Sequence, residues 1–419
     1  MGKSVIIVGA GVFGLSTALE LSRTVDQHEY DNITILDRAM PPVTGGASVD
    51  INRIMRPDYA DPVYSSMGLE VLKEWQTNPL YRDHFYQSHI MFIAKDNADF
   101  RETSQGNLRE FGIELKPVKN ANDAKKLYPA FDGPLTTAHG YAHENAGWVN
   151  AEGAVRSTVG EILRLGKAKF ITGEDGTMTE LIIENNAVKG VMTASGKVHT
   201  ADLVVMATGP WTPSLIDCED NCVAAAQPVA FLQLTPEETR KYSSIPVYLN
   251  IDSGFFVFPP TKDGVLKCAR HCFGYTNTVA RSWGKVSKPL DKPIVSELPE
   301  DALKVLREGL KDVFNEDIAK RPFFESRICW YTDTPSGDFT LGYHPKYENL
   351  FMCTTGSGHG FKFLPILGKY STGALFKRLD KKLLDKFSWK TARVTDEMQG
   401  DGSRLGAGRQ ELKKLESRL

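Results

Sequence analysis

The chain has little net charge, no long apolar run and no repeated segment. A formal net charge of -2 over 419 residues creates no long-range field that would attract nucleic acid or an anionic membrane. No apolar stretch approaches the roughly 20 residues that a membrane-spanning helix needs, and the opening Met1-Gly2-Lys3-Ser4 does not resemble a signal peptide. With 41% hydrophobic and 24% charged residues, we expect a globular protein with no nucleic-acid or membrane partner.

Cysteine is also scarce, with six residues and no secretory context, so free thiols are the expectation. Two pairs, Cys218 with Cys222 and Cys268 with Cys272, are separated by three residues. Zinc ligand pairs usually have a spacing of two. We therefore predict no metal site.

The chain is too long for one ordinary core, which indicates two domains. A strand over 4–10, a helix over 13–21 and a strand over 32–37 form a β-α-β unit, the start of a parallel sheet. Short strands over 168–171, 177–184, 187–193 and 202–206 are expected to return to this part of the chain.

The predicted fold class is α/β, with a Rossmann-like dinucleotide-binding domain interleaved with an α+β substrate domain built on a mixed sheet. Strands over 229–234, 247–251, 254–259 and 265–270 are expected in the second domain, with a hairpin across 254–271. We expect helices over 64–76, 299–313 and 361–379. The proposed boundaries are 1–80, 150–216 and 326–392 for the nucleotide domain, 81–149 and 217–325 for the substrate domain, and a polar, mobile tail over 393–419.

A glycine-rich turn follows the first strand and opens the first helix. Gly9 and Gly11 allow the tight turn and the close approach of a pyrophosphate, and Gly14 lets helix and strand pack together. Asp37 ends the second strand, where an acid binds ribose hydroxyls. This motif fits NAD or FAD, and the strand running into Thr208-Gly209 favours FAD. The remaining residues predicted to contact the cofactor are Val12, Phe13, Arg38 and Ser48.

Two later segments decide between these cofactors. Arg327-Ile-Cys329-Trp-Tyr-Thr-Asp-Thr-Pro-Ser-Gly-Asp-Phe339 and Gly356-Ser-Gly-His-Gly-Phe-Lys362 resemble the FAD-dependent amine oxidases of the sarcosine oxidase, fructosyl-amino-acid oxidase and L-saccharopine (L-pipecolate) oxidase family. The resemblance implies a D-amino-acid-oxidase/glutathione-reductase-like fold. It also implies FAD bound covalently through the Cys329 sulfur at the 8α-methyl, with Gly358, Gly360, Phe361 and Lys362 beside the flavin. A buried structural cysteine is the alternative for Cys329.

The same resemblance assigns the substrate site. Lys362 and Arg56 hold the substrate carboxylate, Arg53 lies near the flavin, Lys267 promotes the reaction with oxygen, and His271 lines the substrate pocket. An ion pair with Asp50 or Asp58 is the alternative for the two arginines, and His359 is assigned either to the cofactor or to its own turn.

The favoured activity is oxidation of a carboxylated secondary amine of the saccharopine, pipecolate or sarcosine type. Hydride transfer from the C–H next to nitrogen gives an imine, and oxygen is reduced to hydrogen peroxide. His271 supports this branch, because deglycating members of the family have an acid there. The alternatives are a fructosyl-amino-acid oxidase, an oxidase of N-methylated aromatic amino acids whose product cyclises, and an NAD-dependent dehydrogenase or non-catalytic nucleotide-binding protein.

The final tripeptide, Ser417-Arg418-Leu419, is similar to the Ser-Lys-Leu peroxisomal address. It predicts recognition by the peroxisomal import receptor and a peroxisomal location, with the cytoplasm as the alternative. The remaining expected partners are a small-molecule amine and oxygen, and we expect a monomer.

Overall fold

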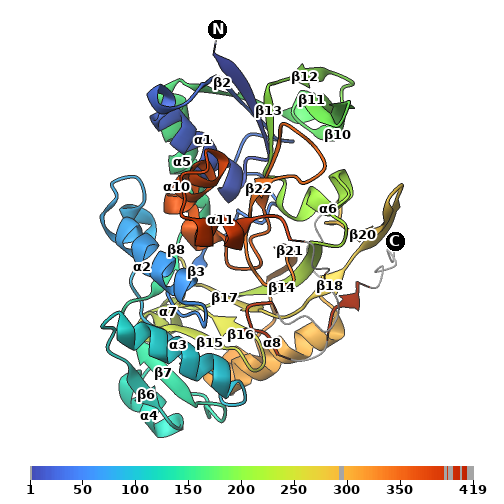
Figure 1. Cartoon of the computed structure of the whole chain (residues 1–419). Coiled ribbons are helices and arrows are strands. Elements are labelled where there is room, and N and C mark those ends of the chain that lie inside the picture. The colour runs from blue at the N-terminus through green and yellow to red at the C-terminus, as the bar shows by residue number, and fades with distance from the viewer. Residues whose placement is uncertain (1, 292–296, 391–393, 395–399, 406–407, 413–419) are drawn as a thin grey trace.

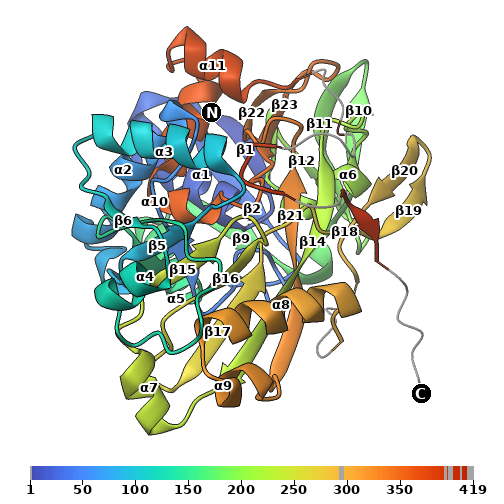
Figure 2. The ribbon, with the colours of Figure 1, turned by 90° about the horizontal axis from the view of Figure 1, so that it is seen from below.

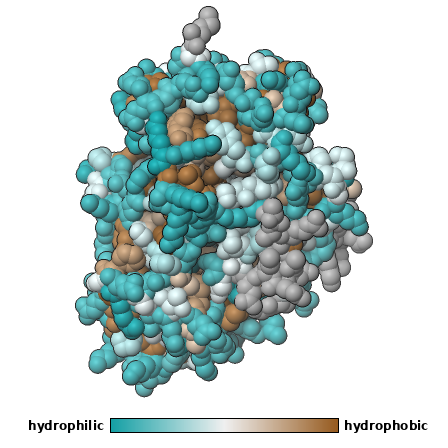
Figure 3. Space-filling view, viewed as in Figure 1, coloured by the Kyte–Doolittle hydropathy of each residue, from teal (hydrophilic) through white to brown (hydrophobic). Residues whose placement is uncertain are grey.

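The computed structural model describes residues 2–291, 297–390, 394, 400–405 and 408–412. Two parts, each built on its own sheet, pack against each other (Figures 1 and 2). Hydrophilic residues predominate on the face in Figure 3, and hydrophobic ones show mainly in its upper half. Within the described ranges, every helix is too short or too polar to cross a bilayer.

The first part is a six-stranded sheet in the order β22-β23-β13-β1-β2-β9, parallel except for β22. All four residues of β13 and the last four of β1 are buried, as the continuous apolar runs require in a sheet covered on both faces. The β-α-β unit predicted for the first 37 residues is confirmed. The strands are β1 (Lys3–Val8), β2 (Tyr30–Leu36), β9 (Ala168–Ile171), β13 (Leu203–Met206), β22 (Thr340–Tyr343) and β23 (Leu350–Thr354).

Three helices pack together on this sheet, α1 (Val12–Arg23), α5 (Ala151–Leu165) and α10 (Leu364–Leu375). The N-terminus of α5 is capped by the Asn150 side chain, which accepts from Gly153 N–H at 2.9 Å. Helices α1 and α10 are so close that a Cβ on Gly368 would lie 2.2 Å from the Ser16 carbonyl oxygen. The helix predicted over 361–379 begins instead with the 3₁₀ turn η5 (Phe361–Phe363) and ends at Leu375.

The second part is a ten-stranded mixed sheet in the order β24-β18-β14-β17-β16-β15-β5-β7-β6, with β21 also paired to β14. The predicted hairpin is confirmed, because β16 and β17 are antiparallel. The strands are β5 (Ile90–Ile93), β6 (Lys116–Val118), β7 (Gly140–His143), β14 (Val223–Gln233), β15 (Val247–Asn250), β16 (Phe255–Val257), β17 (Val265–Arg270), β18 (Tyr275–Thr276), β21 (Glu325–Asp333) and β24 (Gln410–Glu411).

Helix α8 (Glu300–Val313) packs on β16 and β17. Its buried residues Ala302, Leu306, Leu310 and Val313 recur at helical spacing, so one apolar face meets the sheet. The remaining helices are α2 (Pro62–Thr77), α3 (Ala98–Glu110), α4 (Ala121–Leu127), α6 (Thr212–Leu215), α7 (Pro236–Tyr242), α9 (Glu316–Lys320) and α11 (Lys381–Phe387).

Three small sheets complete the described structure. The strands expected over 177–184 and 187–193 form a sheet of their own with β12, and do not join the nucleotide-binding sheet. These sheets comprise β10 (Met178–Glu184), β11 (Ala187–Thr193) and β12 (Val198–Thr200); β19 (Thr278–Arg281) and β20 (Gly284–Ser287); and β3 (Arg53–Met55), β8 (Gly147–Val149) and β4 (Phe85–Tyr86). Short 3₁₀ turns are η1 (Val25–Gln27), η2 (Arg82–His84), η3 (Gly173–Asp175) and η4 (Gly209–Trp211).

Two features differ from the predicted boundaries. Strand β21, expected in the nucleotide domain, pairs along its length with β14 of the second sheet. The described residues of 400–412, expected in a mobile tail, pack onto the molecule. Ser403, Arg404 and Leu412 are buried, and β24 pairs with β18. The polar composition of this segment predicted a tail. Composition could not reveal the ion pairs that fix the segment, because their partners lie in distant parts of the chain. The predicted address at 417–419 lies outside the described residues.

Candidate active site

A cavity of about 770 Å³ is lined by residues of both parts. Every residue that the sequence analysis assigned to cofactor or substrate lines this cavity, except Gly14. The assigned residues that line it are Gly9, Gly11, Val12, Phe13, Asp37, Arg38, Ser48, Arg53, Arg56, Thr208, Gly209, Lys267, His271, Cys329, Gly358, Gly360, Phe361 and Lys362.

The glycine turn forms one end of the cavity. Gly9 has a φ of +103°, and a Cβ there would lie 2.4 Å from the Ala207 carbonyl oxygen, so this turn requires glycine. A Cβ on Gly14 would lie 1.8 Å from the Gly9 carbonyl oxygen, which explains why Gly14 closes the turn without lining the cavity. The first turn of α1 holds no acidic residue, so its N–H groups and partial positive charge remain suited to phosphate.

Asp37 is fixed against this turn. Its carboxylate accepts from Ala10 N–H at 2.6 Å and from Arg38 N–H at 2.7 Å. Burial raises the pKa of Asp37, and these two N–H groups oppose that change. The Arg38 guanidinium lies 5.4 Å from the centre of the Trp211 ring, beside Thr208 and Gly209 at the same end of the cavity. An acid at the end of β2 facing a glycine turn is suited to a dinucleotide ribose.

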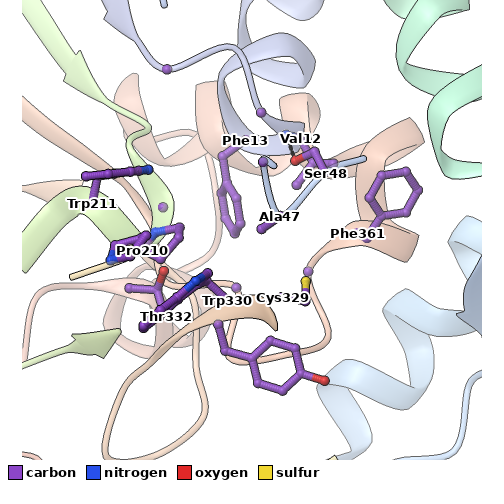
Figure 4. Close-up of a pocket in the computed structure, with 18 of the residues that line it drawn as sticks. Val12, Phe13, Ala47, Ser48, Pro210, Trp211, Cys329, Trp330, Thr332 and Phe361 are labelled. Carbon is purple, nitrogen blue, oxygen red and sulfur yellow. Dashed lines mark hydrogen bonds between the residues drawn. The ribbon is translucent and has the colours of Figure 1, made fainter. Parts of the chain in front are cut away.

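The sulfur of Cys329 faces the cavity from β21. Figure 4 shows it between Trp330 and Thr332 on one side and Ala47 and Phe361 on the other. The other five cysteines are buried, whereas Cys329 is half-buried. Arg53 Nη2 lies 3.6 Å from the Cys329 sulfur. The structure therefore exposes this thiol, and no other cysteine, to the space where a flavin would be bound.

One buried carboxylate, Asp50, pairs with three cations, of which Lys267 and Arg53 line the cavity. Lys267, 2% exposed, donates to Asp50 Oδ2 at 2.6 Å. Arg53 also pairs with Asp50, and Arg327 Nη2 lies 2.8 Å from Asp50 Oδ1. Burial would raise the pKa of Asp50, but the three cations together lower it. The cluster carries excess positive charge. Arg53 both forms the ion pair with Asp50 that was considered as an alternative and lines the cavity.

Burial lowers the pKa of Lys267 to about 7, against the attraction of Asp50. The lysine also donates to the Asn52 carbonyl oxygen at 2.9 Å, so its ammonium is held in one position.

Arg56 and Lys362 form a second cationic group, and neither has a carboxylate partner among the described residues. Lys362 is 5% exposed, and its Nζ donates to Tyr59 Oη at 2.7 Å and to the His359 carbonyl oxygen at 3.1 Å. Burial and then Arg56 lower the pKa of Lys362 well below its ordinary value. Arg56 is 6% exposed, and its Nη1 is buried without a hydrogen-bond partner in the described chain.

The charges of Asp401 and Asp58 oppose the lowering of the Lys362 pKa, but neither acid forms an ion pair with Lys362 or Arg56 in the described chain. Two adjacent buried cations without a direct ion pair are costly, so the site is suited to a carboxylate supplied by a ligand. The ion-pair alternative for Arg56 is wrong as regards Asp58. That carboxylate is bound instead by Tyr141 Oη at 2.8 Å and by His143 Nε2 at 3.0 Å.

Two histidines of the cavity are held uncharged. His271 Nδ1 lies 3.3 Å from Tyr331 Oη, and its Nε2 lies 3.1 Å from Ser403 Oγ. Burial, followed by the charge of Arg404, lowers the pKa of His271 to about 3. His359 bonds the Gly337 carbonyl oxygen at 2.9 Å and Tyr59 Oη at 3.1 Å, and burial with Lys362 lowers its pKa to about 3. Both rings are therefore neutral at physiological pH.

Sequence reasoning assigned no role at this site to three residues. Asp401 lines the cavity from the segment that composition assigned to a tail. Tyr59 bonds both His359 and Lys362, and Asp50 was considered only as an alternative partner for an arginine. The clearest available signal was the apolar surroundings of Asp50, since a carboxylate there needs cations.

The residues present fit FAD: a glycine turn for the pyrophosphate, an acid for a ribose, and a cysteine that faces the same cavity. Comparison with known proteins agrees. The chain belongs to the FAD dependent oxidoreductase family, whose model matches residues 4–373, and it is an FAD-dependent oxidoreductase of the amine-oxidase type.

Its relatives include the L-saccharopine oxidase of Schizosaccharomyces pombe, 31% identical with 93% of this chain and 94% of the relative covered. The peroxisomal sarcosine oxidase of Mus musculus is 25% identical, covering 87% and 90% respectively. Among solved structures, the fructosamine oxidase Amadoriase II from Aspergillus fumigatus has a TM-score of 0.88 at 28% identity, with 98% of this chain and 95% of the other covered. The predicted family and fold class are confirmed, and an NAD-dependent dehydrogenase or non-catalytic nucleotide-binding protein is excluded.

Proposed function

We propose that the protein oxidises a carboxylated secondary amine, with saccharopine as the leading substrate, and that its FAD is attached through Cys329. The observation that carries the substrate class is the pair Arg56 and Lys362. They are two buried cations without an anionic partner in the described chain, and they line the same cavity as the Cys329 sulfur. The choice of saccharopine is supported by the similarity to the L-saccharopine oxidase of Schizosaccharomyces pombe, 94% of which is covered by the comparison.

Each residue has a defined task in this scheme. Arg56 meets one oxygen of the substrate carboxylate with its unpartnered Nη1, and Lys362 meets the other, so that two charge-assisted hydrogen bonds fix the substrate's orientation. The bound carboxylate also compensates the cost of burying Lys362. Bound FAD supplies the redox chemistry, accepting a hydride from the C–H next to nitrogen and passing electrons to oxygen, which gives an imine and hydrogen peroxide.

The remaining wall residues set the electrostatics of the reaction. Neutral His271 and Tyr331 offer hydrogen bonds beside the substrate without adding charge. Lys267, with Arg53 and Arg327, holds positive charge where oxygen gains negative charge during reduction. The scheme requires no side-chain base.

Attachment through Cys329 is supported by its exposure to the cavity and by its contact with Arg53, whose Nη2 lies 3.6 Å from the sulfur. A peroxisomal location rests on Ser417-Arg418-Leu419. A fluorescent protein carrying this tripeptide should enter peroxisomes, and one ending before Ser417 should remain in the cytoplasm.

The test of the activity is oxygen consumption and peroxide release with saccharopine, pipecolate, sarcosine and fructosyl-glycine. We expect the highest kcat/KM with saccharopine. A preference for fructosyl-glycine would favour the second candidate, a deglycating oxidase, which the similarity to Amadoriase II supports. N-methyltyrosine serves as the substrate for the remaining alternative. If none of these compounds causes oxygen consumption, the proposed activity is contradicted.

A further inference from the structure

The described residues 400–405 and 408–412, here called the C-terminal strap, are fixed against the cavity. Arg404 holds Asp333 with Nη1 at 2.7 Å and Nη2 at 3.0 Å, and Nη2 also donates to the Ser357 carbonyl oxygen at 2.9 Å. Arg409 reaches the same carboxylate at 3.2 Å. Further along, β24 extends the second sheet beside β18, where it forms the short dark-red arrow in Figure 2. The strap is therefore part of the cavity wall.

The strap presents a carboxylate, Asp401, to this cavity. Asp401 Oδ1 accepts from Ser403 N–H at 3.1 Å and from Ser403 Oγ at 2.5 Å. Over the described part of the chain, Oδ2 accepts no hydrogen bond. Burial would raise the pKa of Asp401, but the charge that His359 gains in acid, the Ser403 hydrogen bond and Arg404 lower it to about 2. At physiological pH, where His359 is neutral, the Ser403 hydrogen bond and Arg404 still favour the charged carboxylate.

The position of Asp401 separates it from the other acids of the cavity. The described lining residues include three acids, of which Asp37 belongs to the glycine turn and Glu180 to β10 of the first part. Asp401 instead lies near the part of the cavity lined by Arg56, His271 and Lys362, here called the substrate end. Ser403, its hydrogen-bond partner, bonds His271 Nε2 at 3.1 Å. This end of the cavity thus has two cations and one anion. The charge of Asp401 acts on Lys362, but the two form no ion pair in the described chain, so Asp401 can also bind a ligand cation.

That anion is unsuited to the nitrogen being oxidised. A carboxylate in contact with an amine favours its protonated form, and a protonated amine has no lone pair to assist loss of hydride from the adjacent carbon. Asp401 therefore fits a different nitrogen of the substrate, one that remains an ammonium throughout the reaction.

Building on the proposed amine oxidation, we infer that Asp401 determines specificity by binding a second, protonated amino group of the substrate. The substrate class is an amino acid that carries a carboxylated secondary amine and, separately, a primary ammonium. Saccharopine belongs to this class, whereas sarcosine and pipecolate do not.

The test compares two compounds that differ in one group. Saccharopine is the first, and N-(5-carboxypentyl)glutamate, which lacks only the primary ammonium, is the second. For each compound kcat/KM is measured with the wild-type holoenzyme and with Asp401→Asn. Anaerobic binding affinity is measured by calorimetry, which reports on both compounds whether or not they are oxidised.

We expect Asp401→Asn to lower kcat/KM and affinity for saccharopine by about 10- to 150-fold, the range for a charge-assisted hydrogen bond. The effect on the second compound should be less than about threefold. Asp401→Ser should give the same selective loss, so that an effect of the asparagine amide itself is recognised. Thermal denaturation of each variant establishes that the strap remains folded.

The matched control is Glu411→Gln. Glu411 is also a strap carboxylate, but it accepts from Thr276 and Thr278 and does not line the cavity. It should leave both compounds unchanged.

Equal losses for the two compounds in Asp401→Asn would overturn the inference, as would a wild-type enzyme that binds the two equally. Oxidation of sarcosine or pipecolate but not of saccharopine would also overturn it, while leaving the proposed amine oxidation intact. A failure to oxidise any secondary amine would instead contradict the proposed function itself.

Discussion

Replacing Lys362 with methionine should uncouple substrate binding from folding stability. Lys362 is buried, donates only to the uncharged Tyr59 hydroxyl and His359 carbonyl, and has no ion-pair partner among the described residues. Losing two such hydrogen bonds costs about 1–3 kcal/mol. Folding must either bury the Lys362 charge or remove its proton, because the pKa of this lysine is lowered well below its ordinary value. Methionine avoids this cost of several kcal/mol and fills nearly the same volume. The free energy of unfolding should therefore stay equal or rise.

The same change should weaken catalysis. A charge-assisted hydrogen bond to the substrate carboxylate is worth about 1.5–3 kcal/mol, so kcat/KM should fall by roughly 10- to 150-fold. The assays are denaturant unfolding of the ligand-free enzyme and steady-state kinetics on the preferred amine. Lys369→Met is the control, because Lys369 lies on α10, which directly follows the turn that holds Lys362, but is exposed and paired with Glu70 at 2.7 Å. A clear loss of stability with an unchanged kcat/KM would refute the reasoning for Lys362.

Four further outcomes are expected. Cys329→Ala should release its flavin on acid precipitation, while the wild-type pellet stays yellow. Cys353→Ala, a change at a buried thiol, should retain the flavin in the pellet. Free flavin released from the wild type would show that Cys329 does not attach the cofactor. Because burial lowers the pKa of Lys267 to about 7, its charge is present below that pH and lost above it. Stopped-flow reoxidation by oxygen should therefore slow as pH rises through about 7, and should be slow and nearly independent of pH in Lys267→Met; identical profiles would contradict this role. The pKa of Lys362 is lowered in the free enzyme and a bound carboxylate raises it, so the enzyme should take up a proton when the ligand binds. Calorimetry in buffers of different ionisation enthalpy should detect this uptake, and Lys362→Met should abolish it. Asp333→Asn leaves Arg404 and Arg409 buried without their carboxylate and should destabilise the protein by about 3–5 kcal/mol; urea unfolding with a midpoint equal to the wild type would show that the strap is held by other contacts.

The nucleotide-binding end of the molecule could be predicted because its signals are local. The apolar run of β1, the glycines of the turn and Asp37 are consecutive or separated by a single helix, and each is required by a backbone constraint that only certain residues satisfy. Arg56 and Lys362 could be assigned by resemblance, but the observation that neither has an anionic partner required the folded chain.

What the sequence did not reveal depends on distant pairings. Residues 400–412 are polar and glycine-rich, which is typical of a tail. Their described part, 400–405 and 408–412, is held by the ion pairs of Arg404 and Arg409 with Asp333, some 70 residues away. Strand β21 was assigned to the nucleotide domain with the rest of 326–392. Its hydrogen bonds nevertheless run to β14, so that Cys329 reaches the cavity from the opposite sheet.

The central claim is that this cavity binds a flavin that a carboxylated secondary amine reduces. Anaerobic titration of the purified holoenzyme with saccharopine, followed through the flavin absorbance band near 450 nm, tests it most directly. The account predicts complete bleaching at one equivalent, recovery on admitting air, and peroxide equal to the flavin reoxidised. A band unchanged by saccharopine, pipecolate, sarcosine and fructosyl-glycine alike would contradict it.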